Sequence, residues 1–163
     1  MAGEGIQERS AGGGAEGAPA GQAQTELLGF MLSNEEYALD ILEIKEIVRY
    51  QPVTPVPRSP AWLKGIVTLR GVIVPIFDLR CRLGLEEVAH GPDTRIVVVH
   101  RDEELAGLVV DSITQVVRID AGAVEPPPQT IGVVEAEFLR GVARFRDRLV
   151  ILLNLARVLE VAS

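Results

Sequence analysis

Two stretches of the chain show the same pattern of apolar and polar positions. In residues 62–84, two apolar runs rich in Val and Ile flank the pair Arg70-Gly71. This pattern predicts a tight β-hairpin, because glycine accepts the positive φ that such turns require. Asp78 follows the second run at the position of a helix N-cap, and Gly84 stands where a short helix would end. The stretch therefore predicts a hairpin followed by a short helix.

The same arrangement returns near the C-terminus, where residues 138–159 align with residues 62–83 without a gap. The matched positions keep residue size or chemistry: Trp62 with Phe138, Gly65 with Gly141, Arg70 with Arg146, and Asp78 with Asn154. Upstream, residues 25–48 match residues 94–117 more faintly, through apolar positions. This A-B-A′-B′ order is typical of two copies of one β-rich unit of roughly seventy residues. One such unit buries little surface, so we expect one globular body made of two packed halves.

Two further hairpins are predicted from apolar runs that flank polar turns: Leu27–Leu32 with Tyr37–Ile41, and Ile96–Val99 with Leu105–Val110. Proline shapes the remaining segments, because it fixes φ and lacks a backbone donor. Residues 51–60, with four prolines, are expected to form an extended connector, and residues 121–137 a second one. Pro75 is expected to restrict its strand to an edge of a sheet or to a bulge.

A short helical turn is predicted after the first of these hairpins. Ile41, Ile44 and Val48 lie at helical spacing, so residues 41–48 are expected to form this turn and not a third strand. The turn would face Ile44 inward and Glu46 outward. Ile113–Ile119 is expected to parallel it in the second half.

The N-terminal segment differs in composition from the rest of the chain. Residues 1–24 are dominated by Gly and Ala and show neither periodicity nor clustered bulky apolar side chains. Such a segment does not offset the entropy lost on ordering, so it is predicted to be disordered. Residues 25–160 are expected to form the folded body, with halves at roughly 25–92 and 93–160 that can exchange strands.

Charge and composition exclude several classes of function. The net charge is −7 and aromatic residues are 4% of the chain, whereas a nucleic-acid-binding barrel needs a basic face with interleaved aromatics. An acidic body also argues against docking on anionic lipid. Cys81 is the only cysteine, so no internal disulfide is possible, which fits a reducing compartment. With no apolar run long enough for a membrane span and no signal peptide, we expect a cytoplasmic protein without direct membrane contact.

Candidate catalytic and metal-binding residues do not form a recognisable site. Neither histidine of the chain has Cys or carboxylate neighbours at the spacing of metal ligands. Ser112, Asp111 and His100 hold the residue types of a hydrolase triad, but no nucleophile elbow frames the serine. The carboxylate pairs at 35–36 and 103–104 fit solvated turns better than an acid–base pair. We expect no catalytic activity, no metal, no cofactor and no small-molecule ligand.

Four segments, in order, resemble the CheW family of chemotaxis coupling proteins: NEEYALDILEIKEI (34–47), TPVPRSPAWLKGIVTLRGVIVPIFDLR (54–80), GLVVDSI (107–113) and LRGVARFRDRLVILLNL (139–155). The resemblance covers about 26–160. It implies an all-β fold of two SH3-like five-stranded β-barrels related by the internal duplication, with short helices. It also implies a non-enzymatic adaptor that joins chemoreceptor cytoplasmic tips to the CheW-like regulatory domain of the histidine kinase CheA. An adaptor of a non-flagellar array (gliding, pilus or other output) stays the alternative.

The resemblance further implies a receptor-binding face in the groove between the barrels, formed by Ile44, Glu46, Arg70, Gly71 and Val116. Arg70 suits this role because its guanidinium offers a rigid fork of donors to a carboxylate or to backbone carbonyls. Glu46 is expected either to orient that fork or to bind the receptor itself. The helical spacing turns Ile44 inward while the resemblance requires it at the surface, and a half-exposed position satisfies both.

Overall fold

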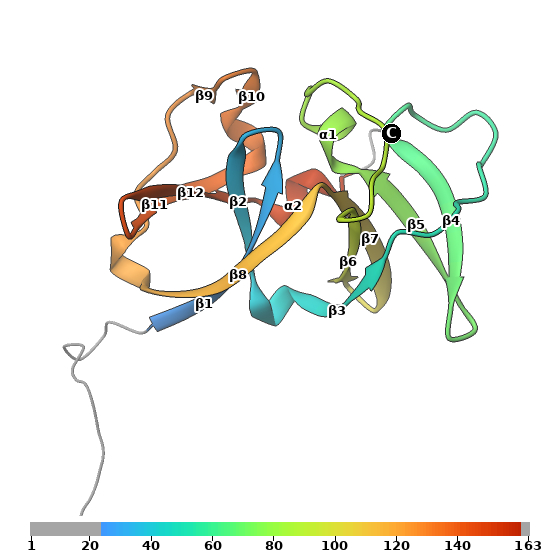
Figure 1. Cartoon of the computed structure of the whole chain (residues 1–163), viewed down its shortest axis with the longest axis horizontal. Coiled ribbons are helices and arrows are strands. Elements are labelled where there is room, and N and C mark those ends of the chain that lie inside the picture. The colour runs from blue at the N-terminus through green and yellow to red at the C-terminus, as the bar shows by residue number, and fades with distance from the viewer. Residues whose placement is uncertain (1–23, 161–163) are drawn as a thin grey trace, which may run out of the picture.

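Residues 24–160 are described by the computed structural model, and they form two mixed five-stranded sheets that lie side by side (Figure 1). Residues 1–23, which hold nearly all of the segment predicted to be disordered, lie outside the described residues, as do residues 161–163. The first sheet has the strand order β11-β12-β2-β1-β8, and the second has the order β3-β6-β7-β5-β4.

The first sheet contains β1 (Gln24–Leu32), β2 (Glu35–Asp40), β8 (Ser112–Asp120), β11 (Leu139–Phe145) and β12 (Arg148–Leu153). The second contains β3 (Ile44–Arg49), β4 (Leu63–Leu69), β5 (Val72–Asp78), β6 (Arg95–Arg101) and β7 (Glu104–Val110). The short elements are α1 (Leu79–Arg82), α2 (Leu155–Val158), the 3-10 turns η1 (Ile41–Glu43), η2 (Ala121–Ala123) and η3 (Ala136–Phe138), and the pair β9 (Thr130–Ile131) and β10 (Val134–Glu135). The predicted all-β class, with two five-stranded units and short helices, is confirmed. Among the described residues each unit is an open row of strands, without pairing between its first and last strand.

The two hairpin–helix segments adopt the same geometry, which confirms the internal duplication. β4, β5 and α1 occupy positions that match β11, β12 and α2. The first turn residue is left-handed in both copies, with φ 51° at Arg70 and φ 51° at Arg146. The side chain of Asp78 accepts a backbone hydrogen bond at 3.3 Å, and that of Asn154 does the same at 3.3 Å. Both residues therefore act as the predicted N-caps.

Each sheet takes strands from both copies of the repeat. β3, which follows the β1–β2 hairpin, pairs antiparallel with β6, and β8 pairs antiparallel with β1. The parallel pairs β5 with β7 and β12 with β2 also join the two copies. Since each half supplies strands to the other, neither half completes its backbone hydrogen bonding alone.

The main hydrophobic core joins the two sheets and lies beneath the short helices. It includes Phe30 and Tyr37 from the first sheet, Phe77 and Leu108 from the second, and Val158 from α2, all at most 1% exposed. Smaller clusters of buried apolar side chains belong to one sheet each. Because the largest cluster contains residues of both sheets, we expect the two sheets to unfold as one cooperative body.

The prediction of a helical turn over residues 41–48 is wrong beyond Glu43. The 3-10 turn η1 ends there, and β3 begins at Ile44. The pairing of β3 with β6 contains a β-bulge between Ile44 and Glu46. The burial of β3 alternates from residue to residue, and Ile44 and Val48, four residues apart, are both half-buried. Positions four apart share a face in a regular strand as well as in a helix, so this spacing does not distinguish the two. The helical reading of Ile113–Ile119 is also wrong, because β8 is a strand, and its pairing with β1 contains a matching register shift.

The prediction that Pro75 restricts its strand to an edge or a bulge is also wrong, because β5 lies between β4 and β7. Pro75 faces Ile66 of β4, whose backbone N–H and C=O bond to Thr54 instead. The Pro75 nitrogen therefore points towards β7, and β5 pairs with β7 only at Ile76–Asp78. An interior strand tolerates this proline because the position needs no ladder hydrogen bond.

Gly65 allows the proline-rich connector to cross close to β4. Gly65 has φ 145°, and a Cβ at this position would lie 2.0 Å from the carbonyl oxygen of Thr54. That oxygen accepts a hydrogen bond from the Ile66 N–H at 2.8 Å. The second copy repeats the contact, because a Cβ at Gly141 would lie 2.6 Å from the carbonyl oxygen of Glu125. Each connector is thus fixed to its own hairpin by a glycine.

We expect Gly65→Ala to lower the free energy of unfolding by about 2–4 kcal/mol, because the added methyl group overlaps backbone and φ becomes strained. Urea denaturation followed by circular dichroism measures the change. Gly84→Ala is the matched control, since Gly84 has φ 83° but no atom within 4 Å of an added Cβ. The control should lose about 1 kcal/mol. Equal losses in the two variants would contradict the close crossing.

Candidate functional site

A bidentate ion pair joins Arg70, in the turn between β4 and β5, to Glu46 on β3. Arg70 Nη2 lies 2.7 Å from Glu46 Oε1, and Arg70 Nε lies 3.3 Å from Glu46 Oε2. The Arg70 side chain is 75% exposed, whereas that of Glu46 is 20% exposed. The hydrogen bond from Arg70 holds the pKa of Glu46 below its usual value. The carboxylate is therefore ionised at neutral pH and orients an accessible guanidinium.

This ion pair links the two ends of the second sheet. β3 and β4 are the two end strands of that sheet, and Arg70 follows β4 directly. Arg70 and Gly71 both have positive φ, of 51° and 82°, so the chain reverses within two residues. The pair holds this turn against β3. A partner that binds Arg70 therefore meets a side chain that is already ordered, which lowers the entropic cost of association.

The second copy of the repeat lacks this arrangement. At the position that matches Glu46 the sequence has Gln115, which carries no charge. Arg146, which matches Arg70, lies over the ring of Phe145 at 5.1 Å. Two turns of the same backbone geometry therefore present their arginines differently. The difference marks the first turn as the candidate site.

The other residues predicted for the receptor-binding face occupy different parts of the fold. Ile44 is half-buried on β3 and packs against the main core. Gly71 occupies the same turn as Arg70, and no atom lies within 4 Å of a Cβ built on it. Val116 is 50% exposed on β8, which belongs to the first sheet. The structure thus brings Glu46 and Arg70 into contact and places Val116 on the other sheet.

Exposed apolar residues follow the ion-pair residues in the sequence, and sequence reasoning did not select them. Ile73 is 63% exposed, Val72 is 48% exposed and Ile47 is 39% exposed. Val72 and Ile73 follow the turn directly, and Ile47 follows Glu46. The sequence does contain a signal for this exposure, because Val72 and Ile73 are bulky apolar neighbours in one strand. Neighbours in a strand face opposite sides, so the two side chains do not share one face. Apolar surface beside an ordered arginine is typical of protein-binding sites.

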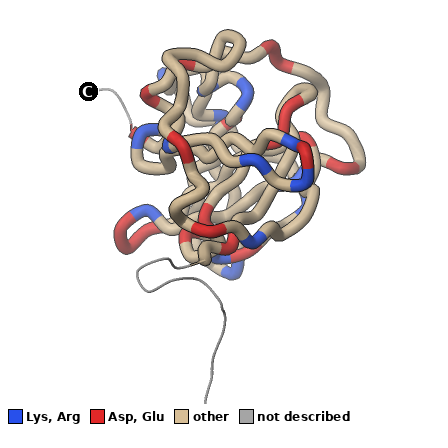
Figure 2. The backbone as a smooth tube through the Cα atoms, turned by 90° about the vertical axis from the view of Figure 1, so that its left-hand side faces the viewer, with Lys and Arg blue, Asp and Glu red and all other residues tan. Residues whose placement is uncertain are grey.

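The described residues offer little for catalysis or metal binding. Among residues 24–160, no group of three or more His, Cys, Asp or Glu side chains is placed to hold a metal ion. Burial raises the pKa of the Cys81 thiol, which lowers its reactivity. No helix in this part of the chain is long and apolar enough to cross a membrane. Figure 2 shows acidic and basic residues interspersed on the face that it presents, without one continuous basic surface.

Comparison with known proteins gives consistent matches. The family model for the CheW-like domain matches residues 26–163. A chemotaxis protein CheW of Klebsiella aerogenes is 36% identical over 135 residues, which cover 83% of this chain and 81% of that protein. The protein FrzA of Myxococcus xanthus is 34% identical over 121 residues, covering 73% and 75%. The crystal structure of the scaffolding protein TtCheW from Thermoanaerobacter tengcongensis superposes with a TM-score of 0.79 at 34% identity, covering 85% of this chain and 90% of that one.

The duplicated all-β fold and these matches define an adaptor, a class of protein that works by binding other proteins. The matches assign this adaptor to chemotaxis signal transduction. The chain belongs to the CheW family.

Proposed function

We propose that this protein couples chemoreceptors to the histidine kinase CheA, with the receptor tip binding at Arg70 and the residues around it. The observation that carries the proposal is the Glu46–Arg70 ion pair, which only one copy of the repeat possesses. An exposed, pre-oriented guanidinium suits a carboxylate or backbone carbonyls of a partner. Ile44, Gly71 and Val116 belong to the same proposed face. The proposed location is the cytoplasm, at receptor arrays, where the protein meets both the receptor and the kinase.

Calorimetric titration of the full chain with each partner separately tests the proposal. The probes are the CheA regulatory domain and a receptor cytoplasmic fragment, both from the genome that encodes this chain. The proposal expects saturable binding of each, and binding of one partner that does not compete with binding of the other. Failure to bind either partner would overturn it.

The proposed kinase contact uses apolar surface away from Arg70. The parallel strands β2 and β12 border a groove of about 380 Å³ whose lining includes Met31, Leu149 and Ile151. Leu149 is 45% exposed there. The family resemblance implies that the kinase regulatory domain has the same two-part form and packs end to end through apolar contacts. This groove offers such a surface.

An apolar contact predicts a weak dependence on salt. We expect the affinity for the kinase regulatory domain to change by less than about threefold as the Debye length falls from roughly 30 Å to roughly 8 Å, because screening acts on charges and not on apolar burial. Calorimetry at the two ionic strengths measures it. Loss of the complex at physiological salt would contradict an apolar interface.

One comparison is compatible with a second output. FrzA of Myxococcus xanthus is similar over most of its length, so an adaptor of a non-flagellar array stays the alternative. The set of genes that neighbour this one distinguishes the two outputs: flagellar and receptor genes favour the first, and gliding or pilus genes favour the second.

A further inference from the structure

The two sheets differ in charge at one pair of positions that the repeat relates. In the first sheet, Arg118 of β8 lies opposite Glu26 of β1. In the second sheet, Arg49 of β3 lies opposite Arg95 of β6. The alignment of residues 25–48 with 94–117, continued by one residue, matches Arg49 with Arg118 and Glu26 with Arg95. An opposite-charge pair in one sheet therefore corresponds to a like-charge pair in the other.

The pair in the first sheet is neutralised within the protein. Arg118 Nη2 donates to Glu26 Oε2 at 2.7 Å. This contact shows how a carboxylate is held by the arginine near the end of the third strand. In the second sheet Arg95 replaces that carboxylate, and two like charges directly opposite each other on neighbouring strands are unfavourable. Arg49 and Arg95 are called the arginine pair below.

No acidic side chain of the described chain compensates the arginine pair. The ion pairs formed among residues 24–160 include neither Arg49 nor Arg95. Arg95 Nη1 donates to the backbone carbonyls of Pro92 and Thr94, at 2.9 Å and 3.0 Å. These two bonds hold the guanidinium at the start of β6, while Arg49 is exposed. A chain with a net charge of −7 thus presents two adjacent positive charges here.

The arginine pair continues the face of the second sheet that packs against the main core. On β6, Arg95 shares a face with Val97, a fully buried member of that core. On β3, Arg49 shares a face with Ile47, which lies opposite Val97 and is 39% exposed. Going outward from the core, this face therefore presents an exposed apolar side chain and then the arginine pair.

The first sheet presents a matching face without the positive charge. Ile47 corresponds to Val116 in the repeat. Val116 lies opposite Leu28, another member of the main core, and is 50% exposed. It belongs to the proposed receptor-binding face. Both sheets thus offer an apolar residue at the border of the core that they share, but only the second sheet adds a charge that a partner can neutralise.

We propose that the arginine pair binds an acidic side chain of the receptor segment that contacts Ile47 and Val116. This carboxylate lies beside Arg49 as Glu26 lies beside Arg118, and it offsets the repulsion between the two arginines through charge-assisted hydrogen bonds. The inference rests on the proposed function, since it assigns a charge to the receptor segment. It adds Ile47, Arg49 and Arg95 to the receptor-binding face.

Calorimetric titration with a lipid-free receptor cytoplasmic fragment, from the genome that encodes this chain, tests the inference. Arg49→Glu should weaken receptor binding at least about tenfold, because the new carboxylate pairs with Arg95 and repels the acidic side chain of the receptor. Arg118→Glu is the matched control, because it changes the net charge equally at the position that the repeat relates to Arg49. The control should lose less than about threefold, since Arg118 is already paired within the protein.

The dependence on salt gives a second readout. The affinity of the parent protein should fall more than that of Arg49→Glu as the Debye length decreases from roughly 30 Å to roughly 8 Å, because screening weakens the ionic contact that the variant lacks. Equal salt dependence of the two proteins would contradict such a contact. If circular dichroism shows that Arg49→Glu does not fold, Arg49→Gln with Arg118→Gln as its control decides, with the same ranking expected.

The outcomes separate this inference from the function on which it rests. Receptor binding by the parent protein, with equal losses in Arg49→Glu and Arg118→Glu, would show an effect of net charge alone and overturn the inference. Undiminished binding by Arg49→Glu would overturn it as well, and in both cases the proposed coupling function would stand. A parent protein that binds no receptor fragment would overturn the function and the inference together.

Discussion

Charge reversal at Arg70 should weaken receptor binding about 30- to 700-fold. Arg70 is the exposed end of an ordered ion pair, and exposed Val72 and Ile73 follow its turn in the sequence; arginines at the centre of interfaces often dominate interface energetics. Arg70→Glu removes the donors offered to the receptor and places two carboxylates side by side, so Glu46 is also displaced. Binding of a receptor cytoplasmic fragment, measured by calorimetry, reports the change.

Arg146→Glu is the matched control for this reversal. Arg146 has the same backbone geometry in the second copy but lies over Phe145. We expect the control to bind the receptor like the parent, and both variants to keep kinase binding and thermal midpoint nearly unchanged, since exposed ion pairs contribute little to stability. Equal losses at the two arginines, or none at Arg70, would refute the assignment.

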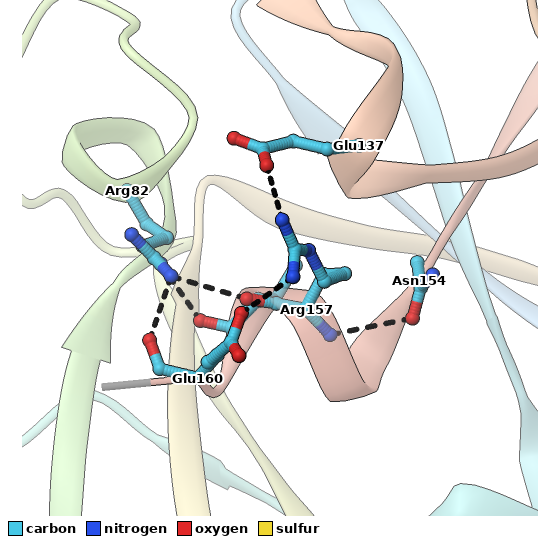
Figure 3. Close-up of polar contacts among 6 residues, drawn as sticks. Arg82, Glu137, Asn154, Arg157 and Glu160 are labelled. Carbon is cyan, nitrogen blue, oxygen red and sulfur yellow. Dashed lines mark hydrogen bonds and ion pairs between the residues drawn. The ribbon is translucent and has the colours of Figure 1, made fainter. Parts of the chain in front are cut away.

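The second large effect concerns stability and follows from Arg82 at the end of α1. Its guanidinium lies between two aromatic rings, 4.4 Å from Trp62 and 5.0 Å from Phe138. It also donates to three backbone carbonyls at the C-terminal end of α2, those of Arg157, Val158 and Glu160, at 2.7 to 3.1 Å (Figure 3). One arginine of the first copy therefore caps the helix of the second.

Arg82→Leu should lower the free energy of unfolding by about 2–4 kcal/mol, because it removes charge-assisted hydrogen bonds and cation–π contacts and leaves carbonyls of α2 without donors. For a chain of this length the thermal midpoint should fall by roughly 5–12 °C. Arg82→Lys should fall between the parent and Arg82→Leu, since an ammonium lacks the planar fork. Differential scanning calorimetry and urea denaturation measure both quantities.

Arg118→Leu provides the comparison for Arg82. Arg118 pairs with Glu26 at 2.7 Å, but its side chain is 63% exposed. We expect the comparison variant to lose less than about 1 kcal/mol. If Arg82→Leu cost no more than this variant, Arg82 would not link the two halves as described.

The hairpin–helix units were predictable because their signals are local. Arg70 and Gly71 define a two-residue turn, and Asp78 defines the start of a helix, within a stretch short enough for turn and cap preferences to act. The internal repeat then carried the same prediction to residues 138–159. Local chemistry and structure agree in both copies.

The third strand of each half was missed because its apolar positions fit a helix as well as a strand. Ile44 and Val48 lie four residues apart, a spacing that is compatible with either structure. The partner of β3 lies about fifty residues further along the chain, and the partner of β8 is β1 near the start of the described chain. Arg82 was missed for a different reason. A basic residue in the last turn of a helix suggests a cap for its own helix, and only the tertiary fold places it at the end of α2.

The candidate site was only partly accessible from the sequence. The family resemblance selected Glu46 and Arg70, but their contact depends on β3 leaving its own hairpin to join the second sheet. This arrangement does not follow from residue spacing, because it joins segments that are distant in the chain.

Capture of a receptor by immobilised kinase tests the proposed coupling most directly. The CheA regulatory domain is fixed to a support, and a receptor cytoplasmic fragment is added with this protein, without it, or with its Arg70→Glu variant. Retention of the receptor is expected only with the parent protein, while the variant stays bound to the kinase domain and retains no receptor. Receptor retention that does not depend on the protein, or that persists with Arg70→Glu, would contradict coupling through this site.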